Sequence, residues 1–105
     1  MSPNVLRRAQ AEHDIEIAAE HYFEQGGAPL ELRFIDALEA AINEIANEPR
    51  VGSDWIGRQL GKLGLRTRAL KKFPYYLFYV QSSENIELWR VLHRRRDLPA
   101  PFQDR

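Results

Sequence analysis

The chain contains no cysteine, and this absence limits the kind of protein it can be. Disulfides and thiolate metal sites are excluded, so folding needs no oxidising compartment. Long apolar runs are also missing, and the N-terminal stretch MSPNVLRRAQ lacks the apolar segment of a secretory signal. We therefore expect a cytoplasmic protein with no membrane partner.

Recognisable metal and nucleophile motifs are missing as well. No two histidines have the short spacing of a zinc site, the three being His13, His21 and His93. None of the serines lies in a G-x-S-x-G context, and the Gly61-Lys62 pair lacks the Ser or Thr that a phosphate-binding loop requires. We expect neither a metal site nor a cofactor.

What is present suffices for one folded domain. At 105 residues, of which 44% are hydrophobic, the chain can form a single core and has no room for a second domain. We expect one domain over residues 1–105, with an irregular tail at 98–105 because Pro99 and Pro101 limit regular structure there.

A net charge of zero hides a strong asymmetry. Residues 1–49 carry three arginines and ten acids, a balance of −7, whereas residues 50–105 carry twelve Lys or Arg and five acids, a balance of +7. Such a split points to an anionic or acidic partner for the basic half. The alternative is that acidic helices and a basic sheet attract each other within the fold.

Two amphipathic helices are predicted in the acidic half. Residues 11–25 have apolar side chains at three- and four-residue spacing. Gly26-Gly27 ends this helix because glycine accepts the left-handed backbone of a helix terminus, and Pro29 suits the first turn of a second helix that runs to about Asn47. We expect a helical hairpin whose apolar stripes face a core.

The basic half changes to the pattern of a sheet. Hydrophobic side chains alternate with polar ones from Lys62 onward. Residues 75–81 are apolar on both faces, which is typical of a central strand. The predicted segments are an edge strand at 3–8, a loop anchored by Trp55 at 51–61, strands at 62–72, 75–81 and 86–93, and a turn at 82–85.

Basic side chains gather on and after these strands. The last strand ends in His93, which three arginines follow directly. Arginine carries a planar fork of donors that suits phosphate. We predict target contacts at Arg66, Arg68, Lys71, Lys72, Arg90, Arg94, Arg95 and Arg96. The alternative for each is a solvated position on the outer face of a half-buried sheet.

The same groups could form a metal-free ribonuclease. Histidine titrates near neutral pH, so His93 could act as acid or base, while Arg66 and Arg90 hold phosphate. These three residues are the catalytic candidates if the protein is an enzyme.

Several short motifs, taken in order, resemble a known family. They are Ala9 and Asp14 at the start of the first helix, Pro49-Arg50-Val51-Gly52, Leu65-Arg66, Phe73-Pro74-Tyr75 leading to Tyr79, and Val91-Leu92-His93-Arg94-Arg95-Arg96-Asp97. From about residue 3 to residue 97, their order and spacing resemble the ParE branch of the RelE/ParE toxin superfamily. Its members are the small toxins of bacterial type II toxin–antitoxin pairs.

The resemblance implies a fold and a partner. The implied fold is α+β, a small antiparallel sheet of three to four strands with the N-terminal helical hairpin packed on one face. The implied partner is a ParD-like antitoxin with a ribbon–helix–helix N-terminus, whose C-terminal segment wraps and neutralises the toxin. We predict that it docks on the apolar stripe around Tyr22 and Phe34, or adds a strand to an open sheet edge.

The two branches of the superfamily differ in target. RelE-like members cleave mRNA on the ribosome with basic residues and a C-terminal tyrosine, whereas ParE-like members are regarded as inhibitors of DNA gyrase without ribonuclease activity. Here no tyrosine follows Tyr79, and residues 59–62 offer no acid to accompany His93. These departures favour a gyrase-binding toxin over an enzyme. The alternatives are a ribosome-dependent mRNA endoribonuclease and a non-toxic remnant that only binds the antitoxin.

Overall fold

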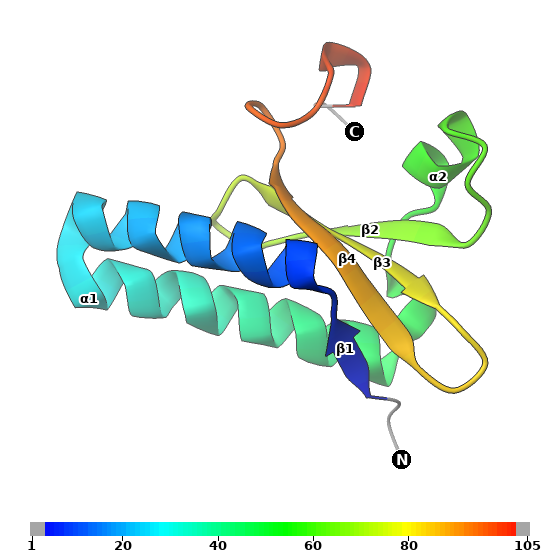
Figure 1. The fold of residues 1–105 in the computed structure, drawn as a ribbon, viewed down its shortest axis with the longest axis horizontal. Helices are drawn as coiled ribbons and strands as arrows, with labels where there is room; N and C mark the ends of the chain where they lie inside the picture. The colour runs from blue at the N-terminus through cyan, green and yellow to red at the C-terminus, as the bar shows by residue number, and fades with distance from the viewer. Residues whose placement is uncertain (1–3, 103–105) are drawn as a thin grey trace.

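In this α+β fold, a helical hairpin covers one face of a four-stranded sheet (Figure 1). The structure is a computed structural model and describes residues 4–102. The elements in chain order are β1 (Val5–Arg7), α1 (Ala9–Asn47), η1 (Pro49–Val51), α2 (Trp55–Gln59), β2 (Leu65–Ala69), β3 (Tyr75–Gln81), β4 (Ile86–His93) and η2 (Ala100–Phe102). The start of the predicted strand at 3–8 and the last residues of the predicted tail lie outside the described residues.

The predicted hairpin is confirmed as two antiparallel arms of α1 (Figure 1). The helix is interrupted at Gly26 and Gly27, and Gly27 has a φ of 70°, a left-handed backbone that favours glycine. Pro29 then lies in the first turn of the second arm. The buried side chains of the two arms are Ala11, Ile15, Ala18, Phe34, Leu38, Ala41, Ile42 and Ile45.

The sheet has the strand order β1-β4-β3-β2, so β3 and β4 are central. The predicted fold class is confirmed, with one difference: β1 runs parallel to β4, which makes the sheet mixed. The chain passes through α1, α2, β2 and β3 between β1 and β4, which leaves ample length for the crossover that a parallel pair needs. A strand of three residues carries no pattern that would indicate its direction.

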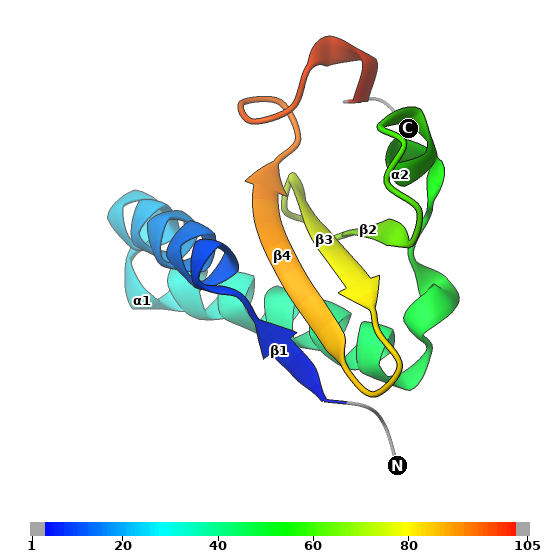
Figure 2. The same ribbon diagram turned by 45° about the vertical axis from the view of Figure 1, so that its right-hand side comes forward.

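Both faces of β3 are covered, as its apolar sequence predicts. Tyr75, Leu77 and Tyr79 belong to the core under the hairpin, whereas Tyr76 and Phe78 belong to a second, smaller core on the opposite face. Figure 2 shows α2 and the C-terminal segment on the side of the sheet away from the hairpin. The sheet is therefore the middle layer of three.

The second core includes two segments that were predicted to lack regular structure, and the prediction for the first of them is wrong. The predicted loop at 51–61 contains the short helix α2, which buries Ile56 against Leu65 and the sheet. The predicted irregular tail contains η2, and the ring of Phe102 lies 5.6 Å from that of Trp55. Both segments are held by contacts distant in sequence, which local composition does not encode.

The first long strand begins later than predicted. It starts at Leu65 rather than Lys62, because Gly61 and Gly64 both have positive φ and break the extended backbone. Leu63, one of the hydrophobic positions in the alternating pattern of the predicted strand, is 91% exposed.

Two searches of residues 4–102 give negative results. No helix there combines the length and the apolar character needed to cross a membrane. No group of three or more His, Cys, Asp or Glu side chains in the same part of the chain is placed to hold a metal ion.

Candidate functional site: the basic end of the sheet

Two turns meet at the end of the sheet where β3 begins and β4 ends (Figure 2). The backbone N–H of Arg94 donates to the carbonyl of Pro74 at 2.9 Å, which joins the turn after β4 to the turn before β3. The joined turns carry five cations that we call the basic end: Lys71, Lys72, Arg94, Arg95 and Arg96. All are exposed except Arg94, which is half-buried.

His93 organises the arginine turn. Its Nδ1 accepts hydrogen bonds from the backbone N–H groups of Arg95 at 3.1 Å and Arg96 at 3.2 Å. The backbone N–H of His93 donates to Oδ2 of Asp97 at 2.8 Å. The candidate acid or base is thus occupied in holding the arginines in place, and it must be neutral at Nδ1 to do so.

The surroundings of His93 favour this neutral form. Burial lowers the pKa of its imidazole, and the nearby Arg96 lowers the pKa further, while Asp97 acts in the opposite direction. Neutral His93 is therefore the state that the fold stabilises.

We expect the stability of the protein to fall when His93 is protonated. The unfolded chain binds this proton more tightly than the folded chain, so the stabilisation is complete above pH 6.5 and is lost as pH falls below that value. At about pH 5.5, one unit below that value, linkage limits the loss from this one group to at most about 1.4 kcal/mol. Urea unfolding at about pH 7.5 and about pH 5.5 measures it.

The His93→Ala variant serves as the control for this prediction, because its stability should change less between the two pH values. Titration of the exposed Glu87 does not contribute to the pH dependence between these two values. Hydrogen bonds from Trp89 and Arg8 lower its pKa below 4.5, so its titration lies at more acid pH. Equal pH dependence of the variant and the wild type would contradict the assignment.

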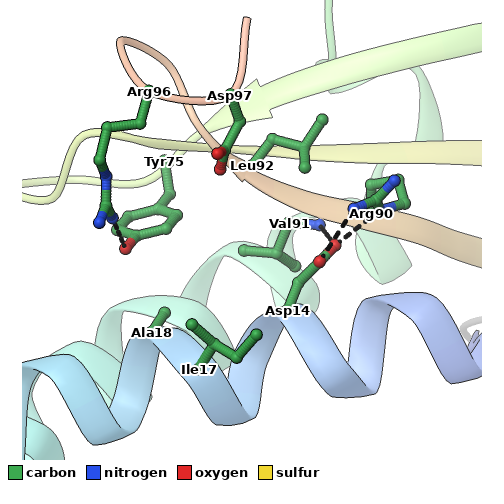
Figure 3. A pocket seen from close by; sticks show the side chains of 9 residues that line it. All are labelled: Asp14, Ile17, Ala18, Tyr75, Arg90, Val91, Leu92, Arg96 and Asp97. Carbon is green, nitrogen blue, oxygen red and sulfur yellow. Dashed lines mark hydrogen bonds and ion pairs between the residues drawn. The ribbon is translucent and has the colours of Figure 1, made fainter.

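Arg90, another catalytic and target-contact candidate, is bound to the first arm of α1. Its Nε and Nη2 donate to the Asp14 carboxylate at 2.8 and 3.0 Å, and the N–H of Val91 donates to the same carboxylate at 3.0 Å (Figure 3). The hydrogen bond from Arg90 to Asp14 raises the pKa of Arg90. Asp14, whose side chain is only 10% exposed, thus fastens β4 to the hairpin.

Asp14 and Asp97 lie on either side of a hollow of about 380 Å³ between α1 and the end of β4 (Figure 3). Asp14 accepts a hydrogen bond from the backbone N–H of Val91, and Asp97 accepts one from the backbone N–H of His93. Both donors lie in the part of β4 that does not pair with β1. On the hollow's other wall, Arg96 donates to the Tyr75 hydroxyl at 2.9 Å. These carboxylates occupy donors that an added strand would need at this edge.

The two remaining candidates on β2 are also joined to other elements. Arg66 donates to the carbonyl of Gly52 at 2.7 Å, and Arg68 forms an ion pair with Glu44 at 2.8 Å. Arg66 and Arg68 lie opposite Tyr79 and Leu77 of the neighbouring strand β3, and paired residues share a face of the sheet. Because Tyr79 and Leu77 belong to the core under the hairpin, both contacts lie on the hairpin side. The structure therefore separates the eight predicted target contacts into five at the basic end and three bound elsewhere.

The predicted antitoxin-docking pair lies in an aromatic cluster. Phe34 is fully buried at 0% exposure, so its side chain offers no surface in this conformation. Tyr22 is half-buried, with its ring 5.2 Å from that of Phe34 and 4.9 Å from that of Phe73. Exposed apolar residues of the hairpin lie elsewhere along α1, at Ile17, Phe23 and Leu32.

Tyr79, noted only as part of a sequence motif, has a structural role. Its hydroxyl donates to the carbonyl of Pro49 at 2.7 Å and accepts from the N–H of Gly52 at 2.9 Å. A side chain at Gly52 would collide with this hydroxyl, which explains why glycine ends that motif. Tyr79 thereby fixes the loop that Arg66 also contacts.

We expect Tyr79→Phe to lower the free energy of unfolding by about 1–3 kcal/mol, because Gly52 N–H loses its partner in a buried setting. Chemical denaturation measures the change. Tyr75→Phe is the matched control, because its hydroxyl interacts with the exposed Arg96 and the half-buried Tyr22, which can both hydrogen-bond to water instead, so its loss should cost less. Equal costs for the two variants would contradict this account.

Comparison with known proteins identifies the family. The family model of the ParE toxin of type II toxin–antitoxin systems (parDE) matches residues 5–98. This chain belongs to the ParE toxin family. The resemblance seen in the sequence motifs is thus confirmed. No curated protein matches the chain in sequence.

A solved structure supports the fold of this ParE-family chain. It is described as the chromosomal ParDE TA system from P. aeruginosa, and a chain of it aligns with a TM-score of 0.72. The alignment covers 88% of this chain and 96% of that chain at 17% identity. At that identity the likeness establishes the shared fold.

Proposed function

We propose that this ParE-family toxin inhibits DNA gyrase by binding it through the basic end, and that a ParD-like antitoxin neutralises the toxin. The observation that carries the proposal is the division among the predicted basic residues. Five cations gather at one end of the sheet, while Arg66, Arg90 and His93 are engaged in contacts that hold the fold. This division favours a docking surface over a catalytic one.

Electrostatics supports the same surface. The acidic half of the chain forms the hairpin, whereas the basic end projects from the sheet beside it. Opposite potentials on neighbouring surfaces orient an approaching anionic partner toward the basic side. Gyrase in complex with DNA is a partner of that kind.

The antitoxin is proposed to bind the hairpin. The similar P. aeruginosa structure is named as a ParDE system, which supports a ParD-type partner with a ribbon–helix–helix N-terminus. Because Phe34 is buried, we propose that the contact involves Tyr22 and two exposed apolar residues of the hairpin, Phe23 at 52% and Leu32 at 59% exposure.

Expression of the toxin in growing bacteria tests the proposal against its alternatives. Inhibition of gyrase predicts that a reporter plasmid loses negative supercoiling while transcripts stay intact. Cleaved transcripts on ribosomes with unchanged plasmid topology would instead establish the endoribonuclease reading. Normal growth, unchanged topology and intact transcripts would leave only the non-toxic remnant. Co-expression of the antitoxin should restore growth in the first two cases.

A further inference from the structure

A hollow of about 440 Å³ lies beside the lysines of the basic end, between the second arm of α1 and the turn before β3. Its apolar lining comes from Leu30 and Ala37 on the helix and from Phe73 on the turn. Phe73 is half-buried and its ring packs on the aromatic cluster, so this part of the hollow is anchored to the core. The position of Phe73 in the lining is therefore fixed by its packing on the core.

Three cations share the lining with these apolar residues, which we call the floor of the hollow. Arg33, Lys71 and Lys72 line the hollow, together with one carboxylate, Asp36. Within residues 4–102 none of the three cations forms an ion pair, in contrast to Arg66, Arg68 and Arg90, which are all engaged elsewhere. The hollow therefore presents positive charge that the fold itself does not use.

The backbone at Lys72 is unusual. Its φ is 69°, and it is the only described residue other than glycine with a positive φ. A non-glycine residue in this conformation costs about 1 kcal/mol, so such positions are often kept for a function. Here the left-handed backbone turns the chain between β2 and Phe73, and Lys72 remains at the rim of the hollow.

We propose that this lysine hollow binds an acidic polypeptide segment of a partner protein, with one apolar side chain on the floor and flanking carboxylates at the three cations. A phosphodiester backbone fits less well, because it would leave Leu30, Ala37 and Phe73 uncovered and would place phosphates against Asp36. The proposal rests on the proposed function only in taking the basic end as a binding surface.

A labelled peptide tests this chemistry on the full-length protein. The probe is fluorescein-Glu-Glu-Phe-Glu-Glu, with binding followed by fluorescence anisotropy. We expect the K71E/K72E variant to bind about tenfold more weakly, because two attractions become repulsions. The R50E/R58E variant makes the same change of charge at exposed positions outside the hollow and should bind within about threefold of the wild type.

Two further probes test the floor and the class of ligand. A peptide with Ser in place of Phe should bind about tenfold more weakly, since it buries no apolar side chain. A single-stranded oligonucleotide of equal charge should bind more weakly than the Phe peptide. Tighter binding of the oligonucleotide, or equal binding of the Ser and Phe peptides, would overturn the proposal.

Variants separate this proposal from the others. If K71E/K72E binds the peptide like the wild type, the lysine hollow is wrong; K71Q/K72Q repeats the test should the reversed charges disturb folding. Self-association of the wild type that K71E/K72E abolishes would assign the hollow to a second copy and overturn the proposal. The R94E/R95E variant should bind the peptide as tightly as the wild type although its inhibition of gyrase should be weakened. Failure of the proposed function can therefore be distinguished from failure of this proposal.

Discussion

Bacteria that express the R94E/R95E variant are expected to keep growing under conditions in which the wild-type toxin arrests them. Arg94 and Arg95 lie in the turn after β4, where His93 and Asp97 fix the backbone; Arg95 is exposed and Arg94 is half-buried. Reversing two charges in the proposed gyrase-binding surface should weaken binding by at least about tenfold. Viable counts after induction measure the effect.

The control for this result is R50E/R58E, which changes the net charge by the same amount. Arg58 is 68% exposed and lies on α2, and Arg50 is exposed on η1, so neither belongs to the five cations of the basic end. We expect this variant to remain toxic. Equal loss of toxicity in both variants would mean that total charge, and not the arginine turn, determines the effect.

Phe34→Ala is expected to lower the free energy of unfolding by about 3–5 kcal/mol, because it opens a cavity in a closely packed core. Phe34 is 0% exposed, and its ring lies within 5.5 Å of those of Tyr22, Phe73 and Tyr75. A domain of this size has a total stability of about 5–15 kcal/mol, so the loss is a large share of it. Thermal and urea denaturation measure the change.

Leu32→Ala is the matched control for Phe34→Ala. It removes an apolar side chain from the same arm of α1 at a position that is 59% exposed, and should change stability by less than about 0.5 kcal/mol. If the antitoxin docks on exposed apolar residues of the hairpin, Leu32→Ala should weaken antitoxin binding without affecting folding. Similar stability losses in the two variants would contradict the assignment of Phe34 to the core.

The hairpin and the central strand could be predicted because their signals are local. Gly26-Gly27 and Pro29 mark the break between the arms of α1, and the apolar run of β3 marks a strand covered on both faces. The short helix α2 could not be predicted, because five residues are too few to show a helical period. Its stability comes from burial of Ile56 against Leu65, a tertiary contact.

The candidate site was only partly predictable for the same reason. That five basic residues gather at one end follows from the pairing of β3 with β4, which the sequence indicates. The other three candidates, Arg66, Arg68 and Arg90, form hydrogen bonds or ion pairs with residues far away in the sequence. Asp14, for example, lies 76 positions from its partner Arg90. The role of Asp14 in fastening β4 was missed, although its place in the family motif was a signal that it mattered.

The direct test of the central claim is a supercoiling titration with purified gyrase, relaxed plasmid and purified toxin. The account predicts that wild type and R50E/R58E inhibit supercoiling at micromolar concentration, that R94E/R95E needs at least about tenfold more protein, and that antitoxin added in equal amount restores the reaction. Full supercoiling in the presence of folded wild-type toxin at that concentration would contradict it.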